Sequence, residues 1–304
     1  MEEPHALMRW LMFHFAGGDA LFFALLAAAI LSVWPGDVRN PWQGTLITFV
    51  IVVWGALASP AWPPWGMMAL SGVVLVWRFA VHGMPVGDFL NQHSAVLLRV
   101  TLLIATLAEL STYWASAPPA PARLGVIADS ITAGLDDGDM TWPRLYAERT
   151  GVPVRDASQP GATLKSALKQ AALLEDEPAV VLEIGGNDLL SGLSVDQFTS
   201  DCEALLKRVC QPGRTVWMVE LPLPPLCARY GAAQRRLCQQ SHVQLIPKRR
   251  LMSVLTTSGA TVDSIHLSAR GQKILMETMC QALGNSPQPE AIAPRYERLE
   301  PGRN

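Results

Sequence analysis

Lysine is missing from the first 164 residues of this 304-residue chain. In the first 114 residues the basic side chains are four arginines, yet eight of the ten tryptophans lie there. All five cysteines fall in the second half, where none forms a Cys-x-x-Cys pair. An odd number without such pairs supports neither a zinc site nor a complete disulfide framework. The uneven composition predicts two halves that face different solvents.

A basic stripe is also lacking, and the formal net charge is -2. Both observations exclude a nucleic-acid partner, whose phosphates need clustered lysine and arginine. Long apolar segments fill the first half instead. Residues 20–34 carry no charge, and no charged residue lies between Arg39 and Arg78.

The length of these segments predicts membrane spans. A bilayer-spanning helix needs about 20 apolar residues, and prolines end helices. Pro60, Pro63 and Pro64 therefore divide the stretch between Arg39 and Arg78 into two spans. With the run over 20–34 and a segment over 94–114, we expect about four transmembrane helices within residues 1–116. Buried helices of a soluble protein are the alternative, which the tryptophans at the segment ends disfavour.

This interpretation predicts an integral membrane protein, with the lipid bilayer as a partner and a bacterial inner membrane as its location. Four spans place the amino terminus and the second half on one side. Arginines are balanced across the two sides, so their count does not decide the orientation. A linker rich in alanine and proline favours an extracytoplasmic second half, whereas cysteines without obvious pairing favour the cytoplasmic side. We expect the extracytoplasmic side.

The second half alternates between short apolar runs and longer amphipathic stretches, after a linker over residues 117–122. Such alternation predicts a parallel sheet with helices on both faces. We expect an α/β fold over residues 123–284, a three-layer α/β/α domain with a five-stranded parallel sheet. Residues 285–304, rich in proline and charge, are predicted to be a disordered tail. The expected strands cover residues 123–128, 152–157, 179–184, 215–220 and 243–246, and the expected helices cover 142–150, 164–174, 195–209, 231–241 and 268–283.

Polar residues follow the ends of the expected strands. In an open parallel sheet, ligands bind at the carboxyl ends of the strands, so we expect these residues to gather at one edge. They are Asp129 and Ser130 after the first strand, Gly161 after the second, Gly186, Asn187 and Asp188 after the third, and Asp263 and His266 after the last.

Ser130, His266 and Asp263 are a candidate catalytic triad. A serine hydroxyl needs a base to take its proton, and the base needs a third group to hold its tautomer. The spacing of three residues lets the Asp263 carboxylate bond the His266 imidazole within one turn of chain. His266 would then face Ser130 from a loop.

An oxyanion hole would complete such a site. Its predicted donors are the backbone amides of Ser130 and Gly161 and the side-chain amide of Asn187. Gly186 and the two aspartates Asp129 and Asp188 are predicted to be structural, with the carboxylates bonding loop amides.

These blocks resemble the SGNH/GDSL hydrolase superfamily, whose four name-giving residues match Ser130, Gly161, Asn187 and His266. The resemblance covers about residues 123–283. It implies a flavodoxin-like domain with esterase, lipase, thioesterase or carbohydrate-deacetylase activity and with neither metal nor cofactor. The chain departs from the pattern at Ala128, where the family usually has glycine. If that position needs a positive φ, alanine costs about 1 kcal/mol there.

The predicted function is that of a membrane-anchored serine hydrolase, which cleaves an acyl ester in a lipid or an acylated glycan. The missing Gly-x-Ser-x-Gly sequence argues against the α/β-hydrolase fold. Two alternatives remain open. One is an acyltransferase with the same triad, and the other is a non-catalytic membrane protein that uses the fold for binding, since fold alone does not establish function. Neither the oligomeric state nor the acyl specificity is predicted.

Overall fold

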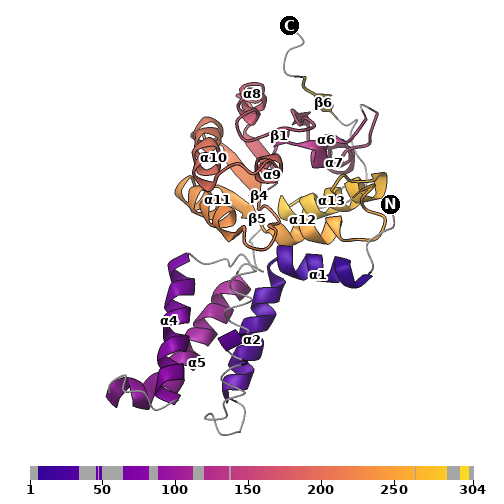
Figure 1. Ribbon diagram of the computed structural model, residues 1–304. Helices are drawn as coiled ribbons and strands as arrows, with labels where there is room; N and C mark the ends of the chain where they lie inside the picture. Colours follow the sequence, from indigo (N-terminus) through magenta and orange to yellow (C-terminus); the bar gives the residue numbers. More distant parts are fainter. Residues whose placement is uncertain are drawn as a thin grey trace. The chain divides into compact units, whose positions relative to one another are not determined.

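The computed structural model describes residues 6–33, 46, 48–49, 64–81, 88–111, 120–136, 138–263, 265–285 and 295–300 (Figure 1). The chain divides into two compact units, which we treat separately. One is formed mainly by Ser116–Pro222 and Ala233–Asn304, and the other mainly by His14–Ala115. Half of the predicted linker, residues 117–119, lies outside the described residues.

The first unit contains a six-stranded sheet in the order β5-β4-β3-β1-β2-β6. Every neighbouring pair of strands is parallel. β1 and β3, in the middle, are buried at every position, as expected for parallel strands that are covered on both faces. The strands are β1 (Leu124–Ala128), β2 (Val154–Asp156), β3 (Ala179–Glu183), β4 (Thr215–Val219), β5 (Gln244–Ile246) and β6 (Tyr296–Arg298).

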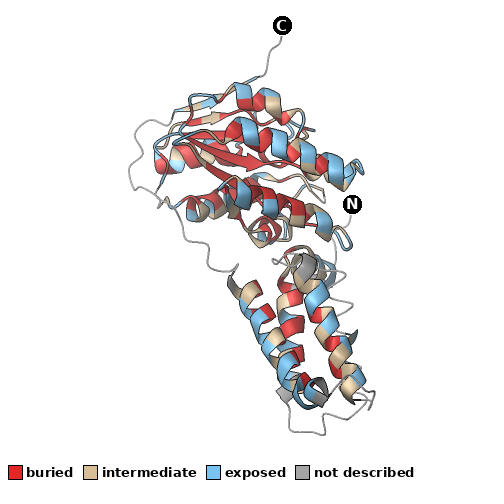
Figure 2. Cartoon of the chain, turned by 90° about the vertical axis from the view of Figure 1, so that its left-hand side faces the viewer, coloured by how far each residue is buried: buried red, intermediate tan, exposed pale blue. Residues whose placement is uncertain are grey.

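Helices cover both faces of this sheet, and their buried sides face the strands (Figure 2). Trp142 and Tyr146 of α7 and Leu275 of α13 belong to one core with Leu124 and Val126 of β1. The predicted three-layer α/β/α architecture is therefore confirmed. The helices are α6 (Ser130–Ala133), α7 (Trp142–Thr150), α8 (Ala167–Ala172), α9 (Gly186–Leu190), α10 (Val195–Val209), α11 (Ala228–Gln240), α12 (Lys248–Leu255) and α13 (Ala269–Ala282).

All five predicted strands and five predicted helices are present, but the prediction of a five-stranded sheet is wrong. A sixth strand, β6, pairs with β2 at the edge, and it comes from residues predicted to be a disordered tail. The strand reads Tyr-Glu-Arg and has no apolar alternation that would reveal it. Backbone bonds from Val154 N to Arg295 O (2.9 Å) and from Leu299 N to Asp156 O (2.7 Å) extend the ladder. Residues 286–294 and 301–304 of the predicted tail lie outside the described residues.

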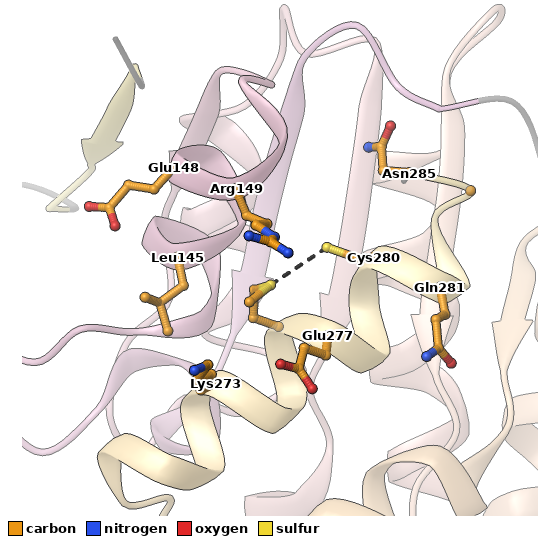
Figure 3. Close-up of a pocket in the computed structure, with 10 residues that line it drawn as sticks. Leu145, Glu148, Arg149, Lys273, Glu277, Cys280, Gln281 and Asn285 are labelled. Atoms are coloured by element: carbon orange, nitrogen blue, oxygen red, sulfur yellow. Dashed lines mark hydrogen bonds between the residues drawn. The ribbon is translucent and has the colours of Figure 1, made fainter. Parts of the chain in front are cut away.

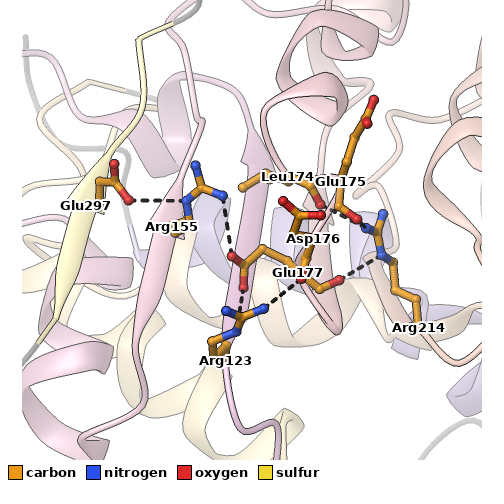
Figure 4. Close-up of polar contacts among 8 residues, drawn as sticks. All are labelled: Arg123, Arg155, Leu174, Glu175, Asp176, Glu177, Arg214 and Glu297. Carbon is orange, nitrogen blue, oxygen red and sulfur yellow. Dashed lines mark hydrogen bonds and ion pairs between the residues drawn. The ribbon is translucent and has the colours of Figure 1, made fainter.

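An ionic cluster holds the amino ends of the strands together (Figure 4). Glu177, 3% exposed, lies 3.6 Å from both Arg123 Nε and Arg155 Nη1. Arg155 also pairs with Glu297 of β6 at 3.2 Å. Arg214 donates to backbone carbonyls of the loop before β3, among them that of Glu177 at 2.8 Å. The cluster leaves the opposite edge, at the carboxyl ends of the strands, for the predicted site.

The second unit is helical and apolar both inside and outside. α2 (Asp19–Val33) and α4 (Pro64–Val81) both pack against α5 (Asp88–Ser111). α1 (Ala6–Ala16) precedes them in the chain, and its residues up to Phe13 belong to the first unit. On the outer surface Met68, Leu103 and Ile104 are 74, 56 and 61% exposed. Helices that are apolar all round are typical of membrane spans. The core comprises Leu21, Leu25, Ala28, Leu70, Val74, Trp77, Leu98, Leu102 and Ala105.

Among the described residues, one helix segment is long and apolar enough to cross a bilayer. It is Gln92–Leu110, with a mean hydropathy of 1.5. Leu7–Ala16 and Leu21–Ile30 meet the criterion only as a pair, with an 84° bend between them, and Gly66–Ala80 is apolar but shorter. The described part of the chain thus supports fewer than the four predicted spans. Most of residues 34–63, where another span is predicted, lies outside it.

Candidate active site

The three residues of the candidate triad meet at the carboxyl edge of the sheet. Ser130 opens α6 close behind β1, and Asp263 and His266 lie in the loop between α12 and α13. The Ser130 Oγ–H points to His266 Nε2 at 3.2 Å, and His266 Nδ1 lies 2.7 Å from Asp263 Oδ2. All three side chains are half-buried, so a substrate can approach them.

The contacts of Asp263 fix its charge and the imidazole tautomer. Oδ2 bonds His266, while Oδ1 accepts backbone N–H bonds from Ile265 and His266, both at 2.7 Å. The bond to His266 and these two backbone bonds lower the pKa of Asp263 to about 2. An ionised carboxylate only accepts hydrogen bonds, so the network assigns the hydrogen to Nδ1. Nε2 is then free to accept the Ser130 proton.

The loop that carries Asp263 and His266 also packs closely against helix α13, which follows it. Ser268 caps this helix by accepting the Gly271 N–H at 3.2 Å, and Val262 N donates to His266 O at 2.9 Å. A Cβ on Gly271 would come within 2.0 Å of the Ala260 carbonyl oxygen. Only glycine lets helix and loop pack this closely.

The turn that carries Ser130 begins with a buried aspartate. Asp129 caps α6 by accepting the Ile131 N–H at 3.0 Å. Within the described part of the chain, no protein acceptor is bound to the backbone amides of Ser130 or Gly161. Gly161 has a φ of 73°, a left-handed conformation that favours glycine. Two predicted oxyanion donors are thus available for a ligand.

The third predicted donor, Asn187, lies in α9 after β3. Its Nδ2 donates to Ala162 O at 2.9 Å and lies 3.4 Å from Asp129 Oδ2. This side chain therefore touches the loop after β1 and the loop after β2. The three predicted donors come from three neighbouring loops at one edge.

The residues predicted to be structural differ in the contacts that they make. Asp188 is buried and accepts the Leu164 N–H at 3.0 Å, which ties α9 to the loop after β2. Gly186 begins α9 near Asp129, since a Cβ there would lie 3.5 Å from Asp129 Oδ2. Gly185, and not Gly186, has the positive φ that favours glycine, at 110°.

Ala128, the departure from the family pattern, is accommodated without strain. It is the last residue of β1, buried and paired with Glu183 of β3. Among described residues other than glycine, only Leu226 and His242 have a positive φ. The position needs no glycine, so the expected cost of alanine does not arise.

Sequence reasoning missed a buried acid beside the serine turn. Glu183 accepts the Thr132 hydroxyl at 3.0 Å, and Thr132 in turn accepts the Trp142 indole N–H at 2.9 Å. The Glu183 carboxyl also shares a hydrogen bond with Asp129. The sequence carries one indication of this residue, since Glu183 is a carboxylate at the end of an otherwise apolar strand.

Gln272 of α13 was also missed. Its Oε1 accepts the backbone N–H of Trp142 at 2.8 Å, and its Nε2 donates to Ile131 O at 2.9 Å. Gln272 is buried, so both bonds are shielded from water. One side chain thus ties the helix after His266 to the turn that contains Ser130. No spacing in the sequence indicates a contact across so many residues.

Burial sets the charges of the Asp129 and Glu183 pair. It raises the pKa of Asp129 to about 6 and that of Glu183 well above its usual range. Asp129 is therefore the more acidic of the two, and Glu183 keeps its proton to a higher pH than an ordinary glutamate. Glu183 is then the donor in their shared bond, and it keeps the Asp129 cap in place.

Glu183→Gln is expected to stabilise the fold increasingly as the pH rises from 5 to 8. An unfolded glutamate loses its proton near pH 4.3, whereas the folded Glu183 keeps it. Because the folded state binds more protons, wild-type stability falls as pH rises, by at most about 1.4 kcal/mol per pH unit. Glutamine carries no such proton. Thermal unfolding at pH 5, 6.5 and 8, with the exposed Glu203→Gln as control, measures the difference; a constant difference would show that Glu183 is ionised in the fold.

A surface pocket of about 790 Å³ lies between α7 and α13, away from the triad (Figure 3). Its charges are mixed, with Arg149 and Lys273 beside Glu148 and Glu277. None of the predicted site residues lines it. Among the described residues, no group of three histidine, cysteine or acidic side chains is placed to hold a metal ion.

The chain is similar to known esterases and lipases. Residues 129–274 match the GDSL-like lipase/acylhydrolase family. The chain is 33% identical to esterase TesA of Pseudomonas aeruginosa over 202 residues, which cover 61% of this chain and 98% of that protein. An arylesterase of Vibrio mimicus is 25% identical over 185 residues, covering 55 and 91%.

Solved structures of similar proteins include two esterases. The psychrotrophic esterase EstA of Pseudoalteromonas sp. has 22% identity and a TM-score of 0.49, covering 54% of this chain and 97% of that one. The structure of TesA has 30% identity and a TM-score of 0.47, covering 53 and 97%. On the strength of the family match and the identity to TesA over nearly its whole length, the chain belongs to the GDSL-like lipase/acylhydrolase family and is a carboxylic ester hydrolase.

Proposed function

We propose that this enzyme is a membrane-anchored serine esterase in which Ser130, His266 and Asp263 form the catalytic triad. The observation that carries the proposal is the continuous chain of hydrogen bonds from Ser130 through His266 to Asp263, at 3.2 and 2.7 Å. It links a nucleophile to a base and the base to an orienting carboxylate, in the order that acyl transfer needs.

The proposed reaction has two halves. His266 Nε2 takes the Ser130 proton as Oγ attacks the acyl carbon, and it then passes that proton to the departing alcohol. A water molecule repeats the sequence on the acyl-serine and releases the acid. Asp263 stays ionised throughout and stabilises the imidazolium that forms twice per turnover.

The negative charge that develops on the acyl oxygen needs donors already in place. The Ser130 and Gly161 amides are available, as described above. The Asn187 amide is held at Ala162 O, and its second contact, with Asp129, is long at 3.4 Å. A bound oxyanion can replace that weak contact, which makes Asn187 the third donor.

The membrane anchor is supported by the helical unit. Leu103, Ile104 and Leu107 of α5 are more than half exposed. Water disfavours such a surface, whereas lipid chains cover it without cost. We place the anchor in a bacterial inner membrane, with the α/β unit on the extracytoplasmic side. Protease added to intact spheroplasts should cleave that unit, and resistance until lysis would reverse the orientation.

The proposed substrates are acyl esters found at a membrane surface, such as lipids or acylated glycans. An anchor confines the catalytic unit to that surface, which raises the effective concentration of such esters. Water is the proposed acceptor. The acyltransferase alternative differs only in the molecule that receives the acyl group from Ser130.

A fluorophosphonate probe tests the nucleophile. The wild-type chain should be labelled on Ser130, and Ser130→Ala should not be labelled. Ser253→Ala, on the exposed face of α12, is the matched control and should react like the wild type. Equal labelling of Ser130→Ala would place the nucleophile elsewhere.

Incubation with an acyl ester and candidate alcohols tests the acceptor. It should release free acid only, and an acylated alcohol as main product would favour the acyltransferase.

A further inference from the structure

Arg298, in the edge strand β6, contacts two segments next to the active site. Arg298 lies opposite Asp156 in the register of β6 on β2. Its Nη1 donates to Ala133 O at 2.9 Å, and its Nη2 donates to Ser158 O at 3.4 Å. One guanidinium therefore bridges two segments that follow different strands.

Both segments carry a predicted oxyanion donor. Ala133 is the last residue of the α6 turn that Ser130 begins, and Gly134 N closes this turn on Ser130 O at 3.2 Å. Ser158 lies three residues before Gly161. Arg298 thus links the turn of the Ser130 amide to the loop of the Gly161 amide.

A buried carboxylate supports this arrangement. Asp156 is fully buried, and its Oδ1 accepts the Ser158 N–H at 2.9 Å. Its Oδ2 accepts the Tyr296 hydroxyl of β6 at 3.0 Å. Burial raises the pKa of Asp156, and the positive charge of Arg298 acts in the opposite direction. Both Tyr296 and Arg298 of the edge strand are therefore fastened to the base of the Gly161 loop.

We propose that Arg298 is a positioning residue for the esterase reaction, which sets the separation of the Ser130 and Gly161 amides. The inference rests on the proposed function, because it assumes that these amides bind the oxyanion. Oxyanion donors stabilise a transition state only when they are held in place beforehand, and a displacement of about 1 Å can cost about 10²-fold in rate. β6 lies outside the residues that match the family, 129–274.

The planar guanidinium suits this task. It presents several N–H groups in a fixed fork, so it holds two carbonyl oxygens at a defined distance. Lysine carries the same charge on a flexible stem and acts as a point donor, which does not fix that distance. Arginine and lysine at this position should therefore differ in catalysis although both are cations.

Arg298→Ala in the full chain tests the proposal. We expect kcat for a short-chain aryl ester to fall about 10- to 100-fold, with KM changed less than about threefold because ground-state binding does not use the oxyanion donors. Arg298→Lys should recover part of this loss. Glu297→Gln, which removes the neighbouring contact of β6 with Arg155, is the matched control and should keep the wild-type kcat.

A thionoester of the same alcohol separates positioning from general damage. Sulfur in place of the carbonyl oxygen is a poor hydrogen-bond acceptor, so Arg298→Ala should lose less rate on the thionoester than on the ester. Equal losses on both substrates, or an unchanged kcat on the ester, would overturn the proposal. Should Arg298→Ala not fold, Arg298→Lys decides, and a full wild-type kcat in that variant would overturn it as well. Ser130→Ala distinguishes a failure of the proposed triad from a failure of the Arg298 proposal. Turnover by that variant would refute the triad and not the role of Arg298.

Discussion

Ser130→Ala is expected to lower kcat for a short-chain ester by about 10⁶-fold, and adding His266→Ala to the same chain is expected to lower it no further. The two side chains are 3.2 Å apart and act as one unit. Without the Ser130 hydroxyl, His266 has no proton to take, so its removal costs nothing more. The remaining rate should come from the oxyanion donors. Steady-state kinetics of the two single variants and the double variant measure this.

Ser253→Ala is again the control, since the Ser253 side chain lies on the surface of α12 and bonds the Arg250 carbonyl. Its kcat should equal that of the wild type. If the losses of Ser130→Ala and His266→Ala were instead to multiply in the double variant, the two residues would act independently, and the proposed proton transfer between them would be wrong.

Asp263→Asn should lower kcat by about 10⁴-fold near pH 7. The reason lies in the contacts of the carboxylate. Two backbone N–H groups, of Ile265 and His266, already point at Oδ1, so the asparagine carbonyl must take that position. Its NH₂ group then faces His266 Nδ1 and needs an acceptor there. Nδ1 loses its hydrogen, Nε2 gains one, and the imidazole no longer accepts the Ser130 proton.

The low pKa of Asp263 adds a pH dependence. The folded value of about 2 lies below the value of about 3.9 in an unfolded chain. This carboxylate therefore stabilises the fold above about pH 4, and its contribution is lost as the pH falls through about 2. Between pH 5 and 9 the wild-type carboxylate stays ionised, so protonation of Asp263 does not narrow the difference in kcat between the wild type and Asp263→Asn across that range. Asp196→Asn, on the surface of α10, serves as control, and a loss below tenfold in Asp263→Asn would contradict the tautomer argument.

The parts of the site that follow directly from the sequence are those set by strand ends. Ser130 and Asn187 were found because each follows a recognisable apolar strand, and parallel strands end at one edge. The triad spacing adds His266 and Asp263, which lie in one short loop. Local rules suffice for these residues, since the position of each depends on the few residues around it.

Long-range contacts explain what was missed. The pKa of Glu183 is raised only in the folded chain, by burial and by the nearby Asp129 carboxylate. β6 has no strand pattern of its own, and it exists through bonds to β2 and the side chains of Arg155 and Asp156. Pairings between residues about 140 positions apart leave no trace in local composition. The number of membrane spans is likewise not settled by apolar length, since α4 is apolar but short.

Gln272 has a consequence for motion as well as for structure. Because it bonds both the Trp142 amide and the Ile131 carbonyl, the amino end of α13 cannot fray without releasing the turn behind Ser130. The nucleophile and its base then belong to one cooperative opening unit, of the kind that native-state hydrogen exchange detects. The enzyme would be either fully assembled or briefly inactive, with few intermediate geometries in which Ser130 is exposed without its histidine.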